Sequence, residues 1–276
     1  MKVFFPNSAW VKTRERLVLK GGRFAKIDLK VRYGVIIHPK LGPILIDTGY
    51  TEEVISGTKR GVMLDLYARV LRPRLNKAEQ PKAVLARMGY GPEDVRYVIV
   101  THFHADHVSG LGLFPNAQFI VDGAAYKHLR STPRRGNLRH GIFTELLPDN
   151  FSERVIELCH LPEADPGYGL PVGHDIFGDG CAVAVSLEGH AKGQFGILMT
   201  LNGSPLLYAV DVQWLACALT EDRIPGWPSR LVADDFTAYK HSAAIVADYI
   251  KQGHTAVFCH DPETSAYDYL PETIAK

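Results

Sequence analysis

The stretch Thr101-His102-Phe103-His104-Ala105-Asp106-His107 carries three imidazoles and one carboxylate within six consecutive residues. It follows the run YVIV at residues 97–100, which is typical of a buried strand. In an extended backbone, residues two apart share a side, so His102 and His104 can converge on one metal ion. Asp106 and His107 follow in the turn, where they can face a second ion. Because polar groups packed together without a partner cost several kcal/mol, the pattern favours a metal site over a His-rich surface turn.

Four other strand-like runs also end at an ionisable residue. They lead to Asp47 after residues 43–46, His190 after 181–187, Asp211 after 205–210 and His260 after 255–259. In layered α/β folds, strand ends and the loops that leave them are where sites are assembled on a rigid frame. Scattered histidines alone are a weak signal, but the cluster at residues 102–107 indicates that these ends form one site.

Alternating strand and helix patterns indicate an α/β protein with mixed sheets. Further strands are expected at residues 30–37, 118–121 and 196–201, and helices at residues 63–71, 81–88 and 236–250. The uncharged stretch at residues 193–210 contains the turn sequence Asn202-Gly203-Ser204-Pro205, so we expect a hairpin there and not a membrane span. No linker interrupts the chain, and we expect one domain over residues 1–276.

Composition is that of an ordinary globular protein. The 276 residues include 31 Lys+Arg and 30 Asp+Glu, a net charge of +1, with 22% charged and 46% hydrophobic residues. This balance disfavours wholesale disorder and a dedicated nucleic-acid-binding protein. The four cysteines are far apart, so we expect reduced thiols. The N-terminal apolar stretch stops at Pro6, too early for a signal-peptide core, so we expect a cytoplasmic location.

The ordered set of motifs resembles the metallo-β-lactamase superfamily of binuclear metallohydrolases. The set comprises H-x-H-x-D-H after a strand, His190 in Glu188-Gly189-His190, Asp211 at a strand end and His260 near the C-terminus. The resemblance implies an αββα sandwich, in which two mixed β-sheets are flanked by helices. It also implies two divalent metal ions, with zinc expected and Mn, Fe or Co as alternatives.

The same resemblance implies a ligand set and a mechanism. His102, His104 and His190 would hold one metal ion, Asp106, His107 and His260 the other, and Asp211 would bridge them. A hydroxide shared by the two ions would attack a carbonyl carbon, and Asp106 would relay the proton to the leaving oxygen. Asp47 is a candidate for orienting a ligand imidazole, with a turn-forming Asp as the alternative.

Within the superfamily, the layout most resembles the quorum-quenching N-acyl homoserine lactone lactonases and related small lactonases. The chain length, GPILIDTG at residues 42–49 and Phe-x-His-Asp at residues 258–261 carry this likeness. Two positions depart from it. Gln194 replaces a supporting histidine, and Trp214 stands where those lactonases carry a tyrosine three residues after the bridging Asp. Since indole N–H only donates a hydrogen bond, we expect a different substrate pocket. The alternative for Trp214 is a core or rim aromatic.

We therefore expect a metal-dependent hydrolase that opens an ester-type carbonyl, with a lactone such as an acyl homoserine lactone as the expected substrate. The alternatives are a thioester hydrolase of the glyoxalase II type, a phosphodiesterase, or a persulfide dioxygenase with one iron. The expected partner is a small-molecule substrate, with neither nucleic acid nor membrane, and a homodimer is the assembly considered.

Three secondary features have a plain and a functional interpretation. The basic stretch from Lys127 to Arg139 is expected to be a solvated loop, although it could attract an anionic substrate. Four histidines match no ligand position and are expected on the surface or in packing, namely His128, His140, His160 and His174. Ordinary helix packing is expected for an apolar series that could also line an acyl-chain pocket, namely Val62, Met63, Leu66, Val70 and Leu71.

Overall fold

The computed structural model describes residues 1–225 and 233–270, and these contain two six-stranded sheets and one three-stranded sheet. The first sheet has the order β1 (Lys2–Phe4), β4 (Gly34–His38), β5 (Gly42–Ile46), β7 (Tyr97–Ile99), β8 (Gln118–Val121) and β9 (Val155–Glu157). The second has the order β10 (Glu163–Ala164), β11 (Gly173–Asp175), β12 (Ala182–Ser186), β13 (Phe195–Leu201), β14 (Ser204–Val210) and β15 (Thr255–Phe258). Both sheets combine parallel and antiparallel pairs.

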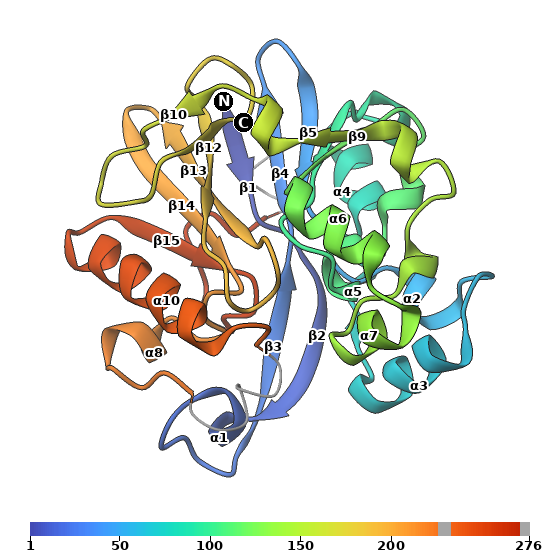
Figure 1. Cartoon of the computed structure of the whole chain (residues 1–276), viewed down its shortest axis with the longest axis horizontal. Coiled ribbons are helices and arrows are strands. Elements are labelled where there is room, and N and C mark those ends of the chain that lie inside the picture. Colours follow the sequence, from blue (N-terminus) through green and yellow to red (C-terminus); the bar gives the residue numbers. More distant parts are fainter. Residues whose placement is uncertain (226–232, 271–276) are drawn as a thin grey trace.

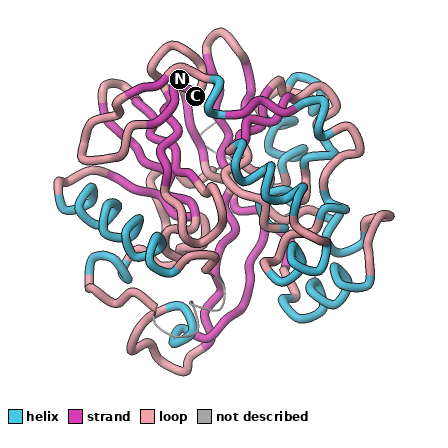
Figure 2. The backbone as a smooth tube through the Cα atoms, in the orientation of Figure 1, coloured by secondary structure: helices cyan, strands magenta, loops and turns pink. Residues whose placement is uncertain are grey.

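Helices cover the outer sides of the two sheets, as Figure 1 shows. Beside the first sheet lie α2 (Glu52–Ser56), α3 (Val62–Leu71), α4 (Pro81–Arg87), α5 (Ala105–Val108), α6 (Gly123–Ser131) and α7 (Arg134–Arg139). Beside the second lie α8 (Cys217–Thr220) and α10 (Phe236–Lys251). The helix, sheet, sheet, helix order is visible in the backbone trace of Figure 2. It confirms the expected αββα sandwich.

The strand β14 shows how the sequence makes the two layers. Successive side chains of a strand point to opposite faces, and Leu206, Tyr208 and Val210 belong to the large core cluster shared with the first sheet. Leu207 and Ala209 belong instead to the cluster that includes residues of α10. A continuously apolar strand is therefore buried on both faces, which holds its C-terminal end in place.

The expected strand at residues 30–37 is wrong, because the chain passes from one sheet to another within it. β3 (Lys26–Arg32) pairs with β2 (Asn7–Arg14), which also pairs with β6 (Arg74–Leu75), and this is the three-stranded sheet. β4 begins two residues later in the first sheet. Between them, the backbone N–H of Tyr33 donates to the Pro6 carbonyl, and the Tyr33 hydroxyl donates to the Glu79 carbonyl. These long-range bonds separate the two strands.

The structure also bears on the expected hairpin and on the basic stretch. The hairpin is confirmed, since β13 and β14 are joined at Asn202 and Gly203, which both have positive φ, as tight hairpin turns require. The basic stretch from Lys127 to Arg139 is not a loop, because most of it forms parts of α6 and α7. Among the described residues, no helix combines the length and apolar character needed to cross a membrane.

Candidate metal centre

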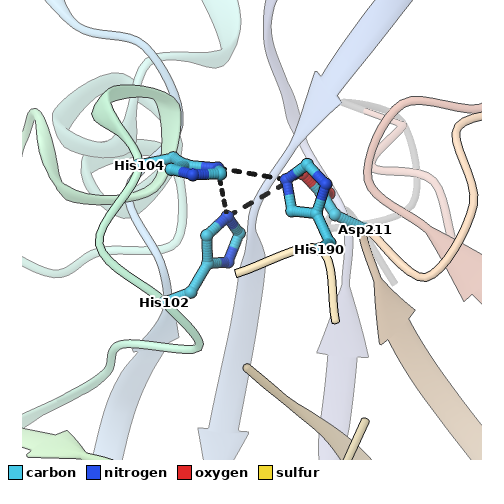
Figure 3. Close-up of side chains that lie close together, drawn as sticks. All are labelled: His102, His104, His190 and Asp211. Atoms are coloured by element: carbon cyan, nitrogen blue, oxygen red, sulfur yellow. Dashed lines mark hydrogen bonds and ion pairs between the residues drawn. The ribbon is translucent and has the colours of Figure 1, made fainter. Parts of the chain in front are cut away.

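Three imidazoles meet where strands of both sheets end. His102 and His104 follow β7, and His190 lies in the loop after β12. The Nδ1 atom of His104 lies 3.1 Å from His102 Nε2 and 3.0 Å from His190 Nε2 (Figure 3). Ligand nitrogens around a tetrahedral ion with bonds of about 2.0–2.1 Å lie about 3.3–3.4 Å apart. The spacing of these three nitrogens is close to that and suits one metal ion.

Asp211 connects this group to a second one. Its Oδ2 lies 3.3 Å from His190 Nε2, 3.4 Å from His107 Nε2 and 3.2 Å from His260 Nε2. The carboxylate of Asp106 also faces the second group, with Oδ2 3.3 Å from His260 Nε2 and 3.8 Å from His107 Nε2. All seven residues expected as ligands are therefore brought together, with Asp211 between the two groups.

Hydrogen bonds outside the centre set the tautomers of the second group. Nδ1 of His260 lies 2.8 Å from the Lys30 carbonyl, and Nδ1 of His107 lies 2.8 Å from Asp47 Oδ2. A carbonyl or carboxylate oxygen only accepts, so each Nδ1 must carry the proton. The lone pair of each Nε2 is then free to face the centre, as a metal ligand requires.

Asp47 reaches the first group as well, through Thr101. The Thr101 hydroxyl donates to Asp47 Oδ2 at 2.7 Å, and the Thr101 backbone N–H donates to Oδ1 at 2.9 Å. With its proton committed, the hydroxyl oxygen is left to accept from His102 Nδ1, which lies 3.2 Å away. Asp47 also has φ +58°, a turn conformation. It is thus both a turn residue and the residue that orients one imidazole of each group.

The electrostatics of the centre favour bound cations. Burial, with His190 beside it, lowers the pKa of His104 to about 3, so this ring is neutral and its lone pair is available. Burial also opposes protonation of His107, but Asp47 and Asp211 outweigh it and raise the pKa of His107 well above its ordinary value. The carboxylates thus attract positive charge at this point, which a metal ion can supply in place of a proton.

Two buried atoms support the fit of a metal ion. Within the described part of the chain, His107 Nε2 and Asp211 Oδ1 are buried and have no hydrogen-bond partner. Leaving such atoms without a ligand costs about 1–3 kcal/mol each. Cys259 lies close to the second group, but its thiol donates to the Arg32 carbonyl at 3.3 Å. Histidine nitrogens and carboxylate oxygens therefore make up the donor set, and it suits divalent metal ions.

Comparison with known proteins agrees with this geometry. The profile of the Metallo-beta-lactamase superfamily matches residues 31–248. The chain belongs to this superfamily. It is 28% identical to the N-acyl homoserine lactonase AttM of Agrobacterium fabrum over 284 residues, covering 100% of this chain and 99% of the relative. An N-acyl homoserine lactonase of Bacillus cereus is 26% identical over 231 residues, covering 83% of this chain and 80% of the relative.

Solved structures show the same fold. The crystal structure of a quorum-quenching N-acyl homoserine lactone lactonase superposes with a TM-score of 0.68 at 18% identity, covering 98% of this chain and 95% of the other. An N-acyl homoserine lactone hydrolase with its product at the catalytic metal centre gives 0.68 at 19% identity, covering 95% and 93%. The expected resemblance to lactonases of the metallo-beta-lactamase superfamily is confirmed, and the chain is a hydrolase of that superfamily.

Five of the seven donor residues line a cavity of about 450 Å³, namely His104, Asp106, His190, Asp211 and His260. Apolar side chains from β2, α1 (Glu15–Val18), β3, α3 and the loop after β14 form much of its wall, namely Val11, Leu17, Val18, Leu29, Leu71 and Trp214. An apolar compartment therefore lies directly beside the donor groups. Small-molecule binding sites commonly combine an apolar wall with a few polar groups in this way.

The two positions that depart from the lactonases have defined places. The ring of Trp214 lines the cavity, with its centroid 6.3 Å from that of His190, and it also packs against the small cluster that contains Leu29. Trp214 is therefore both a rim aromatic and a cavity wall. Gln194 is buried, and its amide donates to the Leu187 carbonyl at 3.0 Å, bracing the loop that carries His190.

The structure bears on two expectations about the surroundings of the centre. His140 is exposed, which confirms the expected surface position, and it lines the cavity together with Arg139. The helical apolar series does not form one packed face, since Val62 is 82% and Val70 70% exposed, whereas Leu71 lines the cavity.

Two cavity tyrosines were missed by sequence reasoning. Tyr67 lies in α3 and Tyr50 in the loop after β5, and both line the cavity. Tyr67 precedes Leu71 by one helical turn, so the helical spacing could have assigned both residues to one face. Without knowing which face of α3 meets the centre, that spacing alone does not single out Tyr67.

Proposed function

We propose that this protein is a metal-dependent lactone hydrolase whose substrate carries an apolar acyl substituent, as acyl homoserine lactones do. The observation that carries this proposal is that two donor groups share Asp211 beside a cavity with a largely apolar wall. Relatives named N-acyl homoserine lactonases that match along the whole chain support the substrate class.

In this proposal His102, His104 and His190 hold one ion, and Asp106, His107 and His260 hold the other. Asp211 is shared by the two groups. Zinc is the expected metal, with Mn, Fe or Co as alternatives, because imidazole and carboxylate ligands suit all four. When bound, two such ions lower the pKa of the attacking water and polarise the substrate carbonyl.

Asp106 moves the proton. Burial alone would raise its pKa, but the charges of His107 and His260 lower the pKa of Asp106 to about 2, so it is present as a carboxylate. The Asp106 carboxylate accepts the proton that the attacking water loses, and Asp106 then passes that proton to the departing ring oxygen. The C–O bond of the ring breaks as the new C–O bond forms, and lactone plus water give one hydroxy acid.

The cavity wall supplies the rest of the recognition. Each methylene that leaves water for an apolar wall stabilises a complex by about 0.8 kcal/mol, so contacts with Leu29, Leu71 and Trp214 favour a substrate with an acyl chain. The indole of Trp214 can in addition donate one hydrogen bond to a polar group of the substrate. Arg139 at the cavity wall adds a cation that suits a carboxylate product.

The test is a panel of lactones, thioesters and phosphodiesters given to the metal-loaded protein, with Asp106→Asn as the matched control. We expect ring opening of an acyl lactone at least about 100-fold above the control, since general acid–base catalysis contributes about 10²–10⁴-fold. Cleavage of only a thioester or only a phosphodiester would overturn the lactone proposal in favour of that activity. A single iron per chain with oxygen uptake would instead indicate a dioxygenase.

Metal content tests the ligand assignment separately. We expect two equivalents of divalent metal per wild-type chain and a loss of bound metal in His102→Ala. Retention of two metal ions by that variant would contradict the assignment. The single domain over residues 1–276, the cytoplasmic location and the homodimer stay predictions from the sequence.

A further inference from the structure

Two tyrosine hydroxyls meet in the wall of the cavity, next to the second donor group. The hydroxyl oxygens of Tyr50 and Tyr67 lie 2.5 Å apart, so they share a hydrogen bond. Tyr50 lies three residues after Asp47, in the loop that leaves β5, and Tyr67 projects from α3. The cavity that both residues line also exposes Asp106 and His260.

Counting protons leaves one donor unused. Each tyrosine hydroxyl carries one proton, so the pair has two, and the bond between them uses one. Within the described part of the chain, this shared bond is the one hydrogen bond that either hydroxyl makes. The second proton is therefore available to a molecule in the cavity.

The two tyrosines differ in their burial. Tyr50 is 1% exposed, whereas Tyr67 is partly exposed and packs its ring against Phe143, with centroids 4.8 Å apart. Either hydroxyl can donate in this pair. When Tyr50 donates to Tyr67, the remaining proton belongs to Tyr67, the more exposed of the two residues, and is available to the cavity. Burial and the Asp106 carboxylate also raise the pKa of Tyr67, so the hydroxyl keeps its proton at neutral pH.

We propose that Tyr67 is a catalytic residue that donates a hydrogen bond to the reacting ester group, and that Tyr50 is the positioning residue that orients the Tyr67 hydroxyl. This inference rests on the proposed ester-type substrate. It places the hydroxyl on a different wall from Trp214, whose ring neighbours His190 of the first donor group. When the Tyr67 hydroxyl accepts a hydrogen bond from Tyr50, its O–H group becomes more polarised. The hydrogen bond that Tyr67 donates is then stronger.

The test is a double-mutant cycle with steady-state kinetics on the lactone or other ester that the wild type opens. We expect Tyr67→Phe to lower kcat by about 10–100-fold, because the removed bond strengthens as charge develops on the substrate oxygen, with KM changed less than about threefold. Tyr50→Phe should lower kcat by about 3–10-fold. In the Tyr67→Phe background, Tyr50→Phe should have no further effect, since Tyr50 acts only through the Tyr67 hydroxyl.

Matched controls separate this role from a structural one. Tyr249→Phe removes a buried hydroxyl on α10, outside the residues that line the cavity, and should leave kcat unchanged. Metal content and the melting temperature should be unchanged in Tyr67→Phe. A kcat within twofold of wild type in Tyr67→Phe, or additive effects in the double variant, would overturn the inference. A wild type that opens no ester at all would instead refute the proposed function.

Discussion

Replacing Asp47 by Asn tests whether one buried carboxylate orients ligands of both metal ions. Asp47 is 0% exposed and accepts three hydrogen bonds, from His107 Nδ1 and from the hydroxyl and backbone N–H of Thr101. Asn offers one acceptor oxygen and one NH₂ group. If the NH₂ group faces Thr101 N–H, two donors meet. If it faces His107, the imidazole must move its proton to Nε2, which removes the lone pair directed at the metal.

The magnitude follows from this geometry. Loss of a hydrogen bond that orients a ligand typically lowers metal affinity by about 10–100-fold, which is about 1.4–2.7 kcal/mol. We expect a loss in this range for both ions in Asp47→Asn, because Thr101 extends the effect to His102. Thr101→Val removes only the hydroxyl. It should lower the affinity for the ion held by His102 and leave the affinity for the other ion near its wild-type value. Thr101→Ser keeps the hydroxyl and is the matched control.

Zinc competition with a chromogenic chelator gives the two affinities, and thermal unfolding of the metal-free proteins shows whether each variant is folded. Wild-type affinity for both ions in Asp47→Asn would refute the orienting role. A lower affinity for only one of the two ions in Asp47→Asn would show that the hydrogen bonds through Thr101 do not affect metal binding by His102.

Two further predictions concern the frame around the centre. Asp268→Asn removes the partner of the buried Arg32 guanidinium, 2.7 Å away, and should lower the free energy of unfolding at pH 7 by about 3 kcal/mol. Burial raises the pKa of Asp268, but Arg32 outweighs burial and lowers this pKa in the folded protein. The stabilisation is therefore fully present above the unfolded pKa of about 3.9 and is lost as the pH falls through the lower, folded pKa. The free energies of unfolding of variant and wild type, measured in urea, should converge as the pH falls below the folded pKa, and a difference independent of pH would contradict this. Gly189→Ala should destabilise the fold by roughly 2–5 kcal/mol, because φ is +122° and a Cβ would lie 2.0 Å from the Tyr239 backbone nitrogen. Gly203→Ala, with positive φ but open space, should cost only about 1 kcal/mol in the same thermal unfolding assay, and equal losses in the two variants would exclude the clash.

The donor residues could be predicted because the information that identifies them is local. The cluster at residues 102–107 is readable within one turn of chain, and each distant donor follows a strand-like run. A strand buried on both faces is recognisable from its composition, and its C-terminal end is a fixed place in the fold. The sequence therefore indicated His190, Asp211 and His260 without any knowledge of how the two sheets pack.

The surroundings of the centre could not be predicted, because they depend on which elements pack across it. Nothing in the sequence distinguishes Tyr67 from the other residues of the apolar helix α3. Its place at the cavity follows only from which face of α3 borders the cavity. His140 has no ligand spacing, and only the position of the chain after α7 brings it to the cavity wall. The break at Tyr33 follows from bonds to Pro6 and Glu79, which are distant in the sequence and leave no local signal.

Backbone strain lies beside two of the carboxylates that organise the centre. Asp47 has φ +58°, and Val210, directly before Asp211, has φ +53°. A β-branched residue rarely adopts this conformation, and such strain costs about 1–3 kcal/mol. The pairing of β14 with β15 shifts register between Tyr208 and Val210. With Val210 outside the extended conformation, Asp211 does not continue the alternation of the strand, and its carboxylate lies against both donor groups. A regular strand would place the next side chain on the face packed against α10, so the strained backbone is what allows one carboxylate to serve both groups.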